Sequence, residues 1–297
     1  KLVWFVINYV TKLGNVGVGG KNPVRIMGIL NTSLESFYKK SIKTTKQQIT
    51  NTVKYMEIEG ADFIDIGGMS TAPYLPTSVS EKIESKRILN AIKIIQNASN
   101  LPISVDTCRA NVAKNALEYG IEIINDISGL KYDNKMINVI EEYGPSLILC
   151  AFNSKIVSGD YITSTKSLLK DSIKIAKIAG ISSNKIVLDP AIGFFRKSGK
   201  GSFFTKIKTD WLERDLFIIK NLKSIKQHYP ILISVSNKSF IGELLGKEDP
   251  SDRLFGSLAA EVVCVLNGAD IIRTHNVAET KDAIKVASIL SRRHKGL

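Results

Sequence analysis

The sequence predicts an α/β fold in which eight parallel strands, each followed by a helix, close into a (β/α)8 barrel. Eight short apolar runs each end at a polar residue, and segments of helix length separate them. Strands that are buried on both faces read as continuous Val, Ile and Leu runs, and helical crossovers make such strands parallel. The runs occupy 25–31, 63–67, 102–107, 122–127, 146–153, 185–190, 230–236 and 269–275.

The segments between the runs carry apolar residues at three- and four-residue spacing, which indicates helices. They lie at roughly 44–59, 78–98, 108–119, 134–143, 163–180, 210–227, 251–267 and 277–294. Glycines, which favour left-handed helix caps, stand where four of these helices should end: Gly60, Gly120, Gly180 and Gly268. The longest irregular stretches, 32–43, 68–77 and 193–209, follow strand ends, where such barrels place their functional loops.

Residues 1–297 are predicted to form a single domain, with 1–23 as an N-terminal strand or hairpin that closes the bottom of the barrel. The apolar stretch at 2–10 is too short to span a bilayer, and it does not read as a secretory signal. We therefore expect no membrane partner.

The composition excludes a disordered chain, since 44% of residues are hydrophobic, 23% are charged and the mean hydropathy is +0.03. The formal net charge of +13 could attract nucleic acid or an anionic substrate, but the lysines are spread along helix faces, which argues against nucleic acid. Cys108, Cys150 and Cys264 have no CxxC spacing and fit reduced thiols in a cytoplasm. Cys108 follows a strand end and could line the site.

Three polar residues at strand ends suit a planar heterocycle that is rich in hydrogen-bond donors. Asp106, Asn125 and Asp189 offer two carboxylates and an amide, and a carboxylate accepts two parallel N–H bonds from an aminopyrimidine edge. A pterin-like or guanine-like ring is the natural partner. Phe194 could cover its face or could be ordinary packing.

Cationic and polar residues gather at the first and last strands, which are neighbours once the barrel closes. Arg273 and His275 project to the same side of the last strand, Asn31 ends the first, and together they predict a diphosphate pocket. Lys238 follows the seventh strand and adds a point charge. The three histidines have no metal-ligand spacing, but Mg²⁺ could bridge a diphosphate to Asn31.

Two carboxylates leave more than one interpretation open. Asp65 could cap the turn that follows its strand or take part in a site. Asn125 and Asp126 are adjacent, and the pleat of a strand prevents both from pointing into the barrel, so one should face the mouth while the other caps.

The order of the motifs resembles the dihydropteroate synthases, the sulfonamide-target enzymes of folate synthesis, from Arg25 to about Lys285. The matching segments are MGILN and SF within 27–37, GADFIDIGGMST at 60–71, PISVDT at 102–107, IINDISG at 123–129, LDPAIGF at 188–194, NKSFIGELLG at 237–246 and GADIIRTH at 268–275.

The resemblance implies a TIM barrel that joins 6-hydroxymethyl-7,8-dihydropterin diphosphate to p-aminobenzoate and releases pyrophosphate. It implies that the pterin is held by Asp106, Asn125, Asp189 and Lys238, and we expect Phe194 to lie beside them. It implies that the diphosphate is held by Asn31, Arg273 and His275, with Mg²⁺ on Asn31, and we expect Thr71 to contribute to the same site. The catalytic set would be Asp106, Lys238, Arg273 and His275, and a homodimer is expected.

The chain departs from the family pattern where the usual ESTRP and SRKS segments each have an arginine, because Ala72 and Asn237 stand there instead. These departures bear on the aminobenzoate more than on the pterin. Three alternatives therefore stay open: a homologue with another aryl amine in a modified-pterin pathway, a methyltransferase-type pterin domain, and a non-catalytic paralogue. The anion pocket of Arg273 and His275 argues against methyl transfer.

Overall fold

The computed structural model describes residues 11–290, apart from 37, 39–40 and 76–78. In this part of the chain eight parallel strands form one sheet in the order β11, β12, β3, β4, β5, β6, β7, β8. They are β3 Arg25–Asn31, β4 Phe63–Gly67, β5 Ile103–Asp106, β6 Ile123–Asp126, β7 Ser146–Cys150, β8 Ile186–Asp189, β11 Leu232–Ile233 and β12 Ile271–Thr274. The sheet closes where the Leu188 amide donates to the Pro230 carbonyl oxygen at 2.9 Å, which confirms the predicted barrel.

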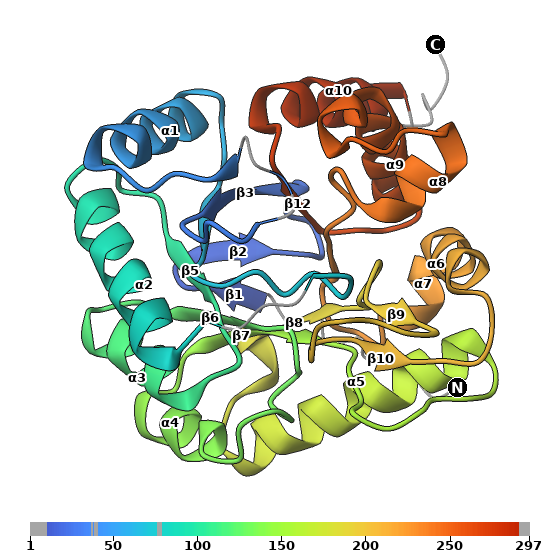
Figure 1. Ribbon diagram of the computed structural model, residues 1–297, viewed down its shortest axis with the longest axis horizontal. Coiled ribbons are helices and arrows are strands. Elements are labelled where there is room, and N and C mark those ends of the chain that lie inside the picture. Colours follow the sequence, from blue (N-terminus) through green and yellow to red (C-terminus); the bar gives the residue numbers. More distant parts are fainter. Residues whose placement is uncertain (1–10, 37, 39–40, 76–78, 291–297) are drawn as a thin grey trace, which may run out of the picture.

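Helices surround the strands on all sides in Figure 1, so each strand is covered from outside. The longer helices are α1 Lys46–Ile58, α2 Glu81–Gln96, α3 Ala110–Glu118, α4 Met136–Tyr143, α5 Tyr161–Ile178, α6 Trp211–Lys220, α9 Leu254–Leu266 and α10 Val277–Leu290. Their amphipathic faces pack on the outer side of the barrel through residues such as Ile49, Ile88 and Leu169, which are fully or almost fully buried.

A hairpin of β1 Thr11–Leu13 and β2 Val16–Val18 lies under the amino ends of the strands. Leu13 and Val18 are fully buried and complete an apolar layer inside the barrel. That layer is otherwise formed by one inward-facing residue from most of the strands: Met27, Phe63, Ile123, Ile148, Val187, Leu232 and Ile271. Of the N-terminal extension predicted over 1–23, residues 11–18 form a hairpin. Residues 1–10 lie outside the described part of the chain.

The seventh strand is shorter than predicted, because β11 covers only Leu232–Ile233 instead of 230–236. The predicted helix at 210–227 is divided into α6 and the short α7 Leu222–Ile225, and Asn221 separates them. The loop after β8 contains the two-residue parallel strands β9 Phe195–Arg196 and β10 Thr205–Lys206, and α8 Ser239–Leu245 follows β11. These additions lie after strand ends and enlarge the loops at the carboxyl end.

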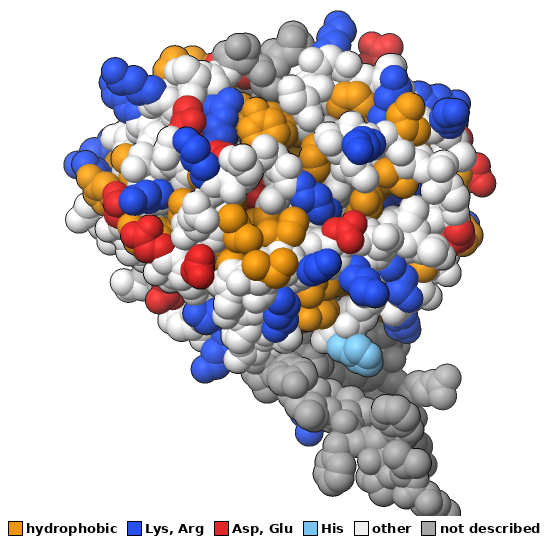
Figure 2. Space-filling view, turned by 90° about the horizontal axis from the view of Figure 1, so that it is seen from below, with side chains coloured by type: hydrophobic (Ala, Val, Ile, Leu, Met, Phe, Trp, Pro, Cys, Tyr) orange, Lys and Arg blue, Asp and Glu red, His pale blue; other side chains and the backbone are white. Residues whose placement is uncertain are grey.

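Among the described residues, no helix combines the length and the apolar character that crossing a membrane requires. On the face shown in Figure 2, Lys and Arg side chains are spread among acidic and hydrophobic ones and do not form a single block. This distribution matches the dispersed lysines of the sequence.

Candidate functional site

The barrel interior changes from apolar to charged along its axis. Alternation along each strand puts Asp65 on the same side as Phe63, Asn125 on the same side as Ile123, and Arg273 on the same side as Ile271. The polar side chains therefore stand above the apolar layer, toward the carboxyl ends. The sequence prediction that these strand ends share one mouth agrees with this arrangement.

Arg273 connects two carboxylates at the centre of the mouth. Its Nε donates to Asp65 Oδ2 at 2.6 Å and its Nη2 donates to Asp106 Oδ2 at 2.8 Å. Asn125 Nδ2 donates to the same Asp65 oxygen at 3.2 Å. Burial raises the pKa of Asp106 to about 7, although the Arg273 guanidinium opposes the shift. The result is a charged network spanning β4, β5, β6 and β12.

Asp65 is the member of this network whose place the sequence left open. It is fully buried and faces into the barrel, and its Oδ1 has no hydrogen-bond partner among the described residues. The alternative reading, a turn cap, belongs instead to Asp126, which accepts from the Ser128 amide at 2.7 Å and the Leu130 amide at 3.0 Å. Asn125 is thus the inward member of the adjacent pair.

A second corner of the mouth lies between β8 and α8. Asp189 Oδ1 accepts from the Ala191 amide at 2.7 Å, and Lys238 Nζ donates to the Ile192 carbonyl oxygen. The same ammonium lies 4.2 Å from the centre of the Phe194 ring. Burial lowers the pKa of Lys238 to about 8, and the neighbouring Asp189 carboxylate opposes that shift. Asp189, Lys238 and Phe194 are therefore brought together, as predicted.

The third corner is formed by the ends of β3 and β12, which pair in register. Asn31 Nδ2 donates to Ser41 Oγ at 2.8 Å and to Ser36 Oγ at 3.3 Å. The Tyr38 ring meets the His275 ring edge-on, with ring centres 5.0 Å apart. Burial lowers the pKa of His275 to about 3, and the Arg273 charge adds to the shift, so the imidazole is neutral near pH 7.

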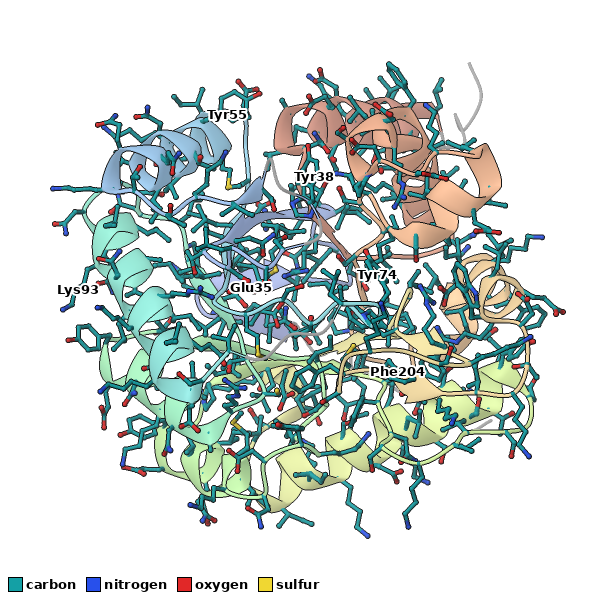
Figure 3. The ribbon with its side chains drawn as sticks, viewed as in Figure 1. Glu35, Tyr38, Tyr55, Tyr74, Lys93 and Phe204 are labelled. Carbon is teal, nitrogen blue, oxygen red and sulfur yellow. The ribbon has the colours of Figure 1, made fainter. Side chains whose placement is uncertain are left out.

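Figure 3 shows Glu35 near the centre of the barrel, Tyr38 beside the ends of β3 and β12, and Tyr74 on the side of β9. Glu35 of the loop after β3 forms two bonds with the Arg87 guanidinium of α2, at 2.9 and 3.1 Å. The Arg87 guanidinium and a bond from Ser33 hold the pKa of Glu35 at about 2. In the loop after β4, the Pro73 carbonyl oxygen accepts from the amides of Lys200 and Gly201.

The remaining predicted residues of these loops differ in their surroundings. Thr71 is half-buried in the loop after β4, and Ala72 beside it is buried. Asn237 has a backbone φ of +57°, and its side-chain oxygen accepts from Ser257 Oγ at 3.2 Å, so the side chain is directed toward α9. Cys108, which could have lined the site, is buried in the apolar layer between strands and helices.

No group of three or more His, Cys, Asp or Glu side chains that could hold a metal occurs in the part of the chain that the structure describes. Asn31 uses its amide nitrogen on Ser41 and Ser36. Its Oδ1 faces Gly67, where a Cβ would lie 3.2 Å away. A single amide oxygen suits Mg²⁺ that takes its other ligands from phosphate and water.

Buried charged residues on α6 and α9 are among those that escaped the sequence prediction. Arg214 and Asp215 of α6 are fully or almost fully buried, and their spacing to Ile218 and Ile219 marks them as part of the inward helix face. That spacing was the available signal. Glu261 of α9 is also fully buried, and its Oε2 accepts from Thr280 Oγ1 at 2.8 Å.

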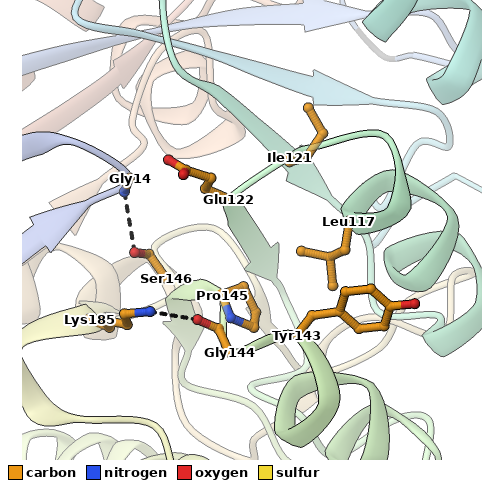
Figure 4. Close-up of a pocket in the computed structure, with 9 residues that line it drawn as sticks. All are labelled: Gly14, Leu117, Ile121, Glu122, Tyr143, Gly144, Pro145, Ser146 and Lys185. Atoms are coloured by element: carbon orange, nitrogen blue, oxygen red, sulfur yellow. Dashed lines mark hydrogen bonds between the residues drawn. The ribbon is translucent and has the colours of Figure 1, made fainter.

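A separate hollow of about 230 Å³ lies at the amino end of the barrel, between the hairpin and the loops that precede β6, β7 and β8 (Figure 4). Gly14 donates to Ser146 Oγ at 3.2 Å and Lys185 Nζ donates to the Gly144 carbonyl oxygen at 2.7 Å along its wall. None of the predicted site residues lines it.

The chain is similar to known proteins over almost all of its length. A family model described as pterin binding enzyme matches residues 27–275. A dihydropteroate synthase of Clostridium beijerinckii is 36% identical over 270 residues, which covers 90% of this chain and 94% of the relative. A dihydropteroate synthase of Synechocystis sp. is 32% identical over 275 residues and covers 90% of both chains.

Solved structures give the same result. A dihydropteroate synthase from Clostridium difficile, determined in the presence of pteroic acid, has a TM-score of 0.79 at 33% identity, covering 91% of this chain and 98% of that one. A dihydropteroate synthase from Xanthomonas albilineans with 4-aminobenzoic acid has a TM-score of 0.79 at 28% identity, covering 91% and 94%.

Proposed function

The chain belongs to the pterin-binding enzyme family, and we propose that it is a dihydropteroate synthase, a transferase of folate biosynthesis. It joins 6-hydroxymethyl-7,8-dihydropterin diphosphate to p-aminobenzoate and releases pyrophosphate. The observation that carries the proposal is the convergence of Asp106, Asn125, Asp189 and Lys238 on one barrel mouth, within the 27–275 match to this family.

The pterin ring binds among the acceptors of the mouth. Asp106, Asn125 and Asp189 offer oxygens to the donor-rich aminopyrimidine edge of the ring, and a carboxylate pairs well with two parallel N–H groups. Phe194 is half-buried beside Lys238, so its ring can lie against a flat ligand. These contacts orient the methylene carbon that carries the diphosphate.

The diphosphate binds at the corner of Asn31, Thr71, Arg273 and His275. Two of the five N–H groups of Arg273 donate to Asp65 and Asp106, which leaves donors for an anion. The neutral His275 imidazole acts there as a hydrogen-bond donor and not as a cation. Asn31 would hold Mg²⁺ through its amide oxygen, and Mg²⁺ when bound would neutralise charge on the leaving diphosphate.

The reaction breaks the C–O bond between the pterin methylene carbon and the diphosphate, and the electron pair leaves with the diphosphate. The Asp106 carboxylate favours the cation that develops on the pterin, and Arg273 favours the departing anion. The amine nitrogen then forms the new C–N bond and releases a proton to solvent. Lys238 contributes by binding the pterin ring and by holding the loop after β8 through its bond to Ile192.

A second candidate for the amine follows from the two positions where the chain lacks the family's arginines. Ala72 is buried and Asn237 is directed toward Ser257, so neither position places a cation at the mouth for an acceptor carboxylate. An aryl amine without that carboxylate is therefore the second candidate. Comparing kcat/KM for p-aminobenzoate with that for neutral para-substituted anilines distinguishes the two acceptors.

We extend the proposal to assembly and compartment. Apolar side chains are exposed on α9 and α10, including Phe255 at 78%, Leu290 at 80% and Val286 at 56% exposure, and a homodimer through this face would cover them. Sedimentation velocity should give a dimer for the native chain and a monomer for Val286→Glu.

The three free cysteines fit a reducing compartment such as the cytoplasm.

The decisive experiment measures pyrophosphate release from 6-hydroxymethyl-7,8-dihydropterin diphosphate with Mg²⁺, with and without p-aminobenzoate. We expect aminobenzoate-dependent release that Asp106→Asn and Arg273→Ala abolish. Asp62→Asn, which weakens an ion pair with Arg25 at the amino end, is the control and should retain activity. Pterin binding without release, for any amine, would instead indicate a non-catalytic paralogue.

A further inference from the structure

Behind the ring-binding corner lies a buried ion pair that makes no direct contact with the mouth residues. Arg214 Nη1 donates to Asp215 Oδ1 at 3.0 Å, and both side chains are fully or almost fully buried on α6. A buried charged pair is costly to desolvate and persists only when further hydrogen bonds satisfy it. The hydrogen-bond partners of Arg214 and Asp215 therefore indicate the structural role of the ion pair.

Most of these partners belong to the backbone that follows β8. Arg214 Nη2 donates to the Pro190 carbonyl oxygen at 2.7 Å, and Nη1 lies 3.4 Å from the Ala191 carbonyl oxygen. Asp215 Oδ2 accepts from the Gly193 amide at 2.8 Å. The pair thus contacts three of the four residues between Asp189 and Phe194.

This short segment has an unusual backbone. Ala191 has a φ of +62°, a left-handed conformation that is unfavourable for a residue with a Cβ, and Gly193 has a φ of +85°. A Cβ at Gly193 would lie 2.8 Å from Lys238 Cδ, so the segment also approaches the lysine closely. Such a conformation lasts only where surrounding contacts impose it, and the Arg214–Asp215 pair supplies three of those contacts.

The pair is itself anchored on several sides. Arg214 Nη2 also donates to Thr165 Oγ1 of α5 at 3.0 Å, and its guanidinium stacks 3.6 Å from the centre of the Phe195 ring. Arg196 lies 3.8 Å from Asp215 and stacks on the Trp211 ring. The loop after β8 is therefore fixed to two helices through one ion pair.

We propose that Arg214 and Asp215 are positioning residues that fix the 190–193 backbone, and so set where Asp189, Phe194 and Lys238 meet the heterocyclic ring. Asp189 precedes this segment, Phe194 follows it, and Lys238 donates to Ile192 within it. All three ring contacts depend on one backbone conformation. The proposal rests on the proposed pterin function, and it adds a set of residues that never touch the ring.

The test is to measure kinetics and ring binding for Asp215→Asn, Arg214→Lys and Arg214→Met. A lysine cannot reproduce the fork that serves Asp215 and Pro190 together. We expect KM for the pterin diphosphate to rise by roughly 10- to 100-fold, since small misplacements of binding groups are that costly. KM for p-aminobenzoate should change less than about twofold, and Arg214→Lys should lie between the native chain and Arg214→Met.

The matched control is Asp270→Asn at the amino end. Asp270 has the same arrangement, with one oxygen 2.7 Å from Lys226 Nζ and the other accepting from the Ile231 amide at 2.8 Å. Fluorescence titration with 6-hydroxymethylpterin and amide hydrogen exchange over 189–194 follow the ring site directly. We expect weaker ring binding and faster exchange in the α6 variants and neither change in the control.

The outcomes separate the two proposals. A native chain that binds no pterin would overturn the proposed function, and the positioning role with it. Native binding with unchanged ring affinity and unchanged exchange in folded Asp215→Asn would overturn the positioning role alone. If Arg214→Met does not fold, Asp215→Asn and Arg214→Lys decide the question, because both keep a polar group of similar size.

Discussion

The two ends of the barrel are made from the same strands but have opposite contents. At the amino end, Leu13 and Val18 of the hairpin close an apolar layer that contains Phe63 and Met27, all of them fully buried. At the carboxyl end, the next inward residues on β4, β8 and β12 are charged, and Arg273 holds two carboxylates together. The interior changes from apolar to ionic over two positions of a strand, as from Phe63 to Asp65 on β4.

This difference shows how one fold can separate stability from chemistry. The lower layer gains free energy mainly from burial of apolar surface, and its polar exception is the buried hydroxyl of Ser104 on β5, in register with Ile123. The upper layer contains a buried oxygen on Asp65 that has no hydrogen-bond partner in the described part of the chain, and a carboxyl, Asp106, whose pKa burial raises to about 7. Such features lower stability and are retained where function requires them. Variants at the two ends should therefore have different readouts.

Among the changes that compare the two ends of the barrel, Asp65→Asn should have the largest effect on activity. It removes the carboxylate that receives Arg273 Nε at 2.6 Å, so the guanidinium is no longer held against both β4 and β5. We expect kcat/KM to fall by roughly 1,000-fold, the range seen when one preorganised electrostatic contact is lost. Steady-state pyrophosphate release is the measurement.

The control for Asp65→Asn is Asp62→Asn, three residues earlier on the chain. Asp62 also pairs with an arginine, Arg25, at 2.9 Å, but at the amino end. If both variants lost activity equally, the contrast between the two ends would be wrong.

Phe63→Ala should have the largest effect on stability. Phe63 is fully buried in the apolar layer, and truncation of such a side chain leaves a cavity and lowers the free energy of unfolding by about 3–5 kcal/mol. Chemical denaturation measures the loss. KM for the pterin diphosphate should stay within about twofold of the native value, and a change of tenfold or more would show that the lower layer also shapes the mouth.

The activity of the native chain should follow a bell-shaped pH profile. Asp106 must be ionised to favour the pterin cation, and the pKa of its carboxyl is raised to about 7, so kcat/KM should rise with pH up to that value. The pKa of Lys238 is lowered to about 8, so activity should decline above it as the ammonium loses its proton. Asp106→Asn should abolish the acidic limb in whatever activity remains, and a surviving acidic limb would assign it to another group.

Glu261→Gln tests a buried carboxyl behind the mouth. Burial raises the pKa of Glu261 to about 7 from 4.5, so between these values the folded chain holds a proton that the unfolded chain releases. The free energy of unfolding therefore decreases as pH rises through this window, and glutamine avoids the loss. We expect little difference at pH 4.5 and a more stable variant at pH 8, by up to about 3 kcal/mol.

Thermal unfolding of the native chain and of Glu261→Gln at both pH values measures that difference. Ser257→Ala, on the same buried face of α9, has no titrating group and should show no pH-dependent difference from the native chain. An equal effect of Glu261→Gln at pH 4.5 and pH 8 would mean that the carboxyl does not titrate in this window.

Much of the fold could be predicted because strands buried on both faces read as continuous apolar runs. The exception is β11, which ends at Ile233 although the apolar run continues to Val235, because the chain there turns toward α8. Hydropathy also misleads at α9, where Ser257, Glu261 and Cys264 face inward while Val263 and Leu266 are exposed. A predominantly apolar helix gives no indication of which side is buried.

The sequence was sufficient to predict which residues lie together at the mouth of the barrel. Strand ends brought Asp106, Asn125 and Arg273 together, because parallel strands deliver their last residues to one rim. The sequence does not specify pairing across the barrel, so the contact of Arg273 with Asp65 remained open. The sequence also does not specify the geometry of the loops. The contact of the Asn237 side chain with Ser257 could therefore not be predicted.

The smallest effect is expected at the amino-end hollow, from Lys185→Met. Lys185 is exposed, and its ammonium donates to the carbonyl oxygen of Gly144, the left-handed cap of α4. A single exposed contact of this kind changes the free energy of unfolding by less than about 0.5 kcal/mol. Denaturant titration should detect no more than that, and kcat/KM should be unchanged. Because the hollow shares no residue with the mouth, a tenfold loss of activity would mean that this end of the barrel contributes to the chemistry.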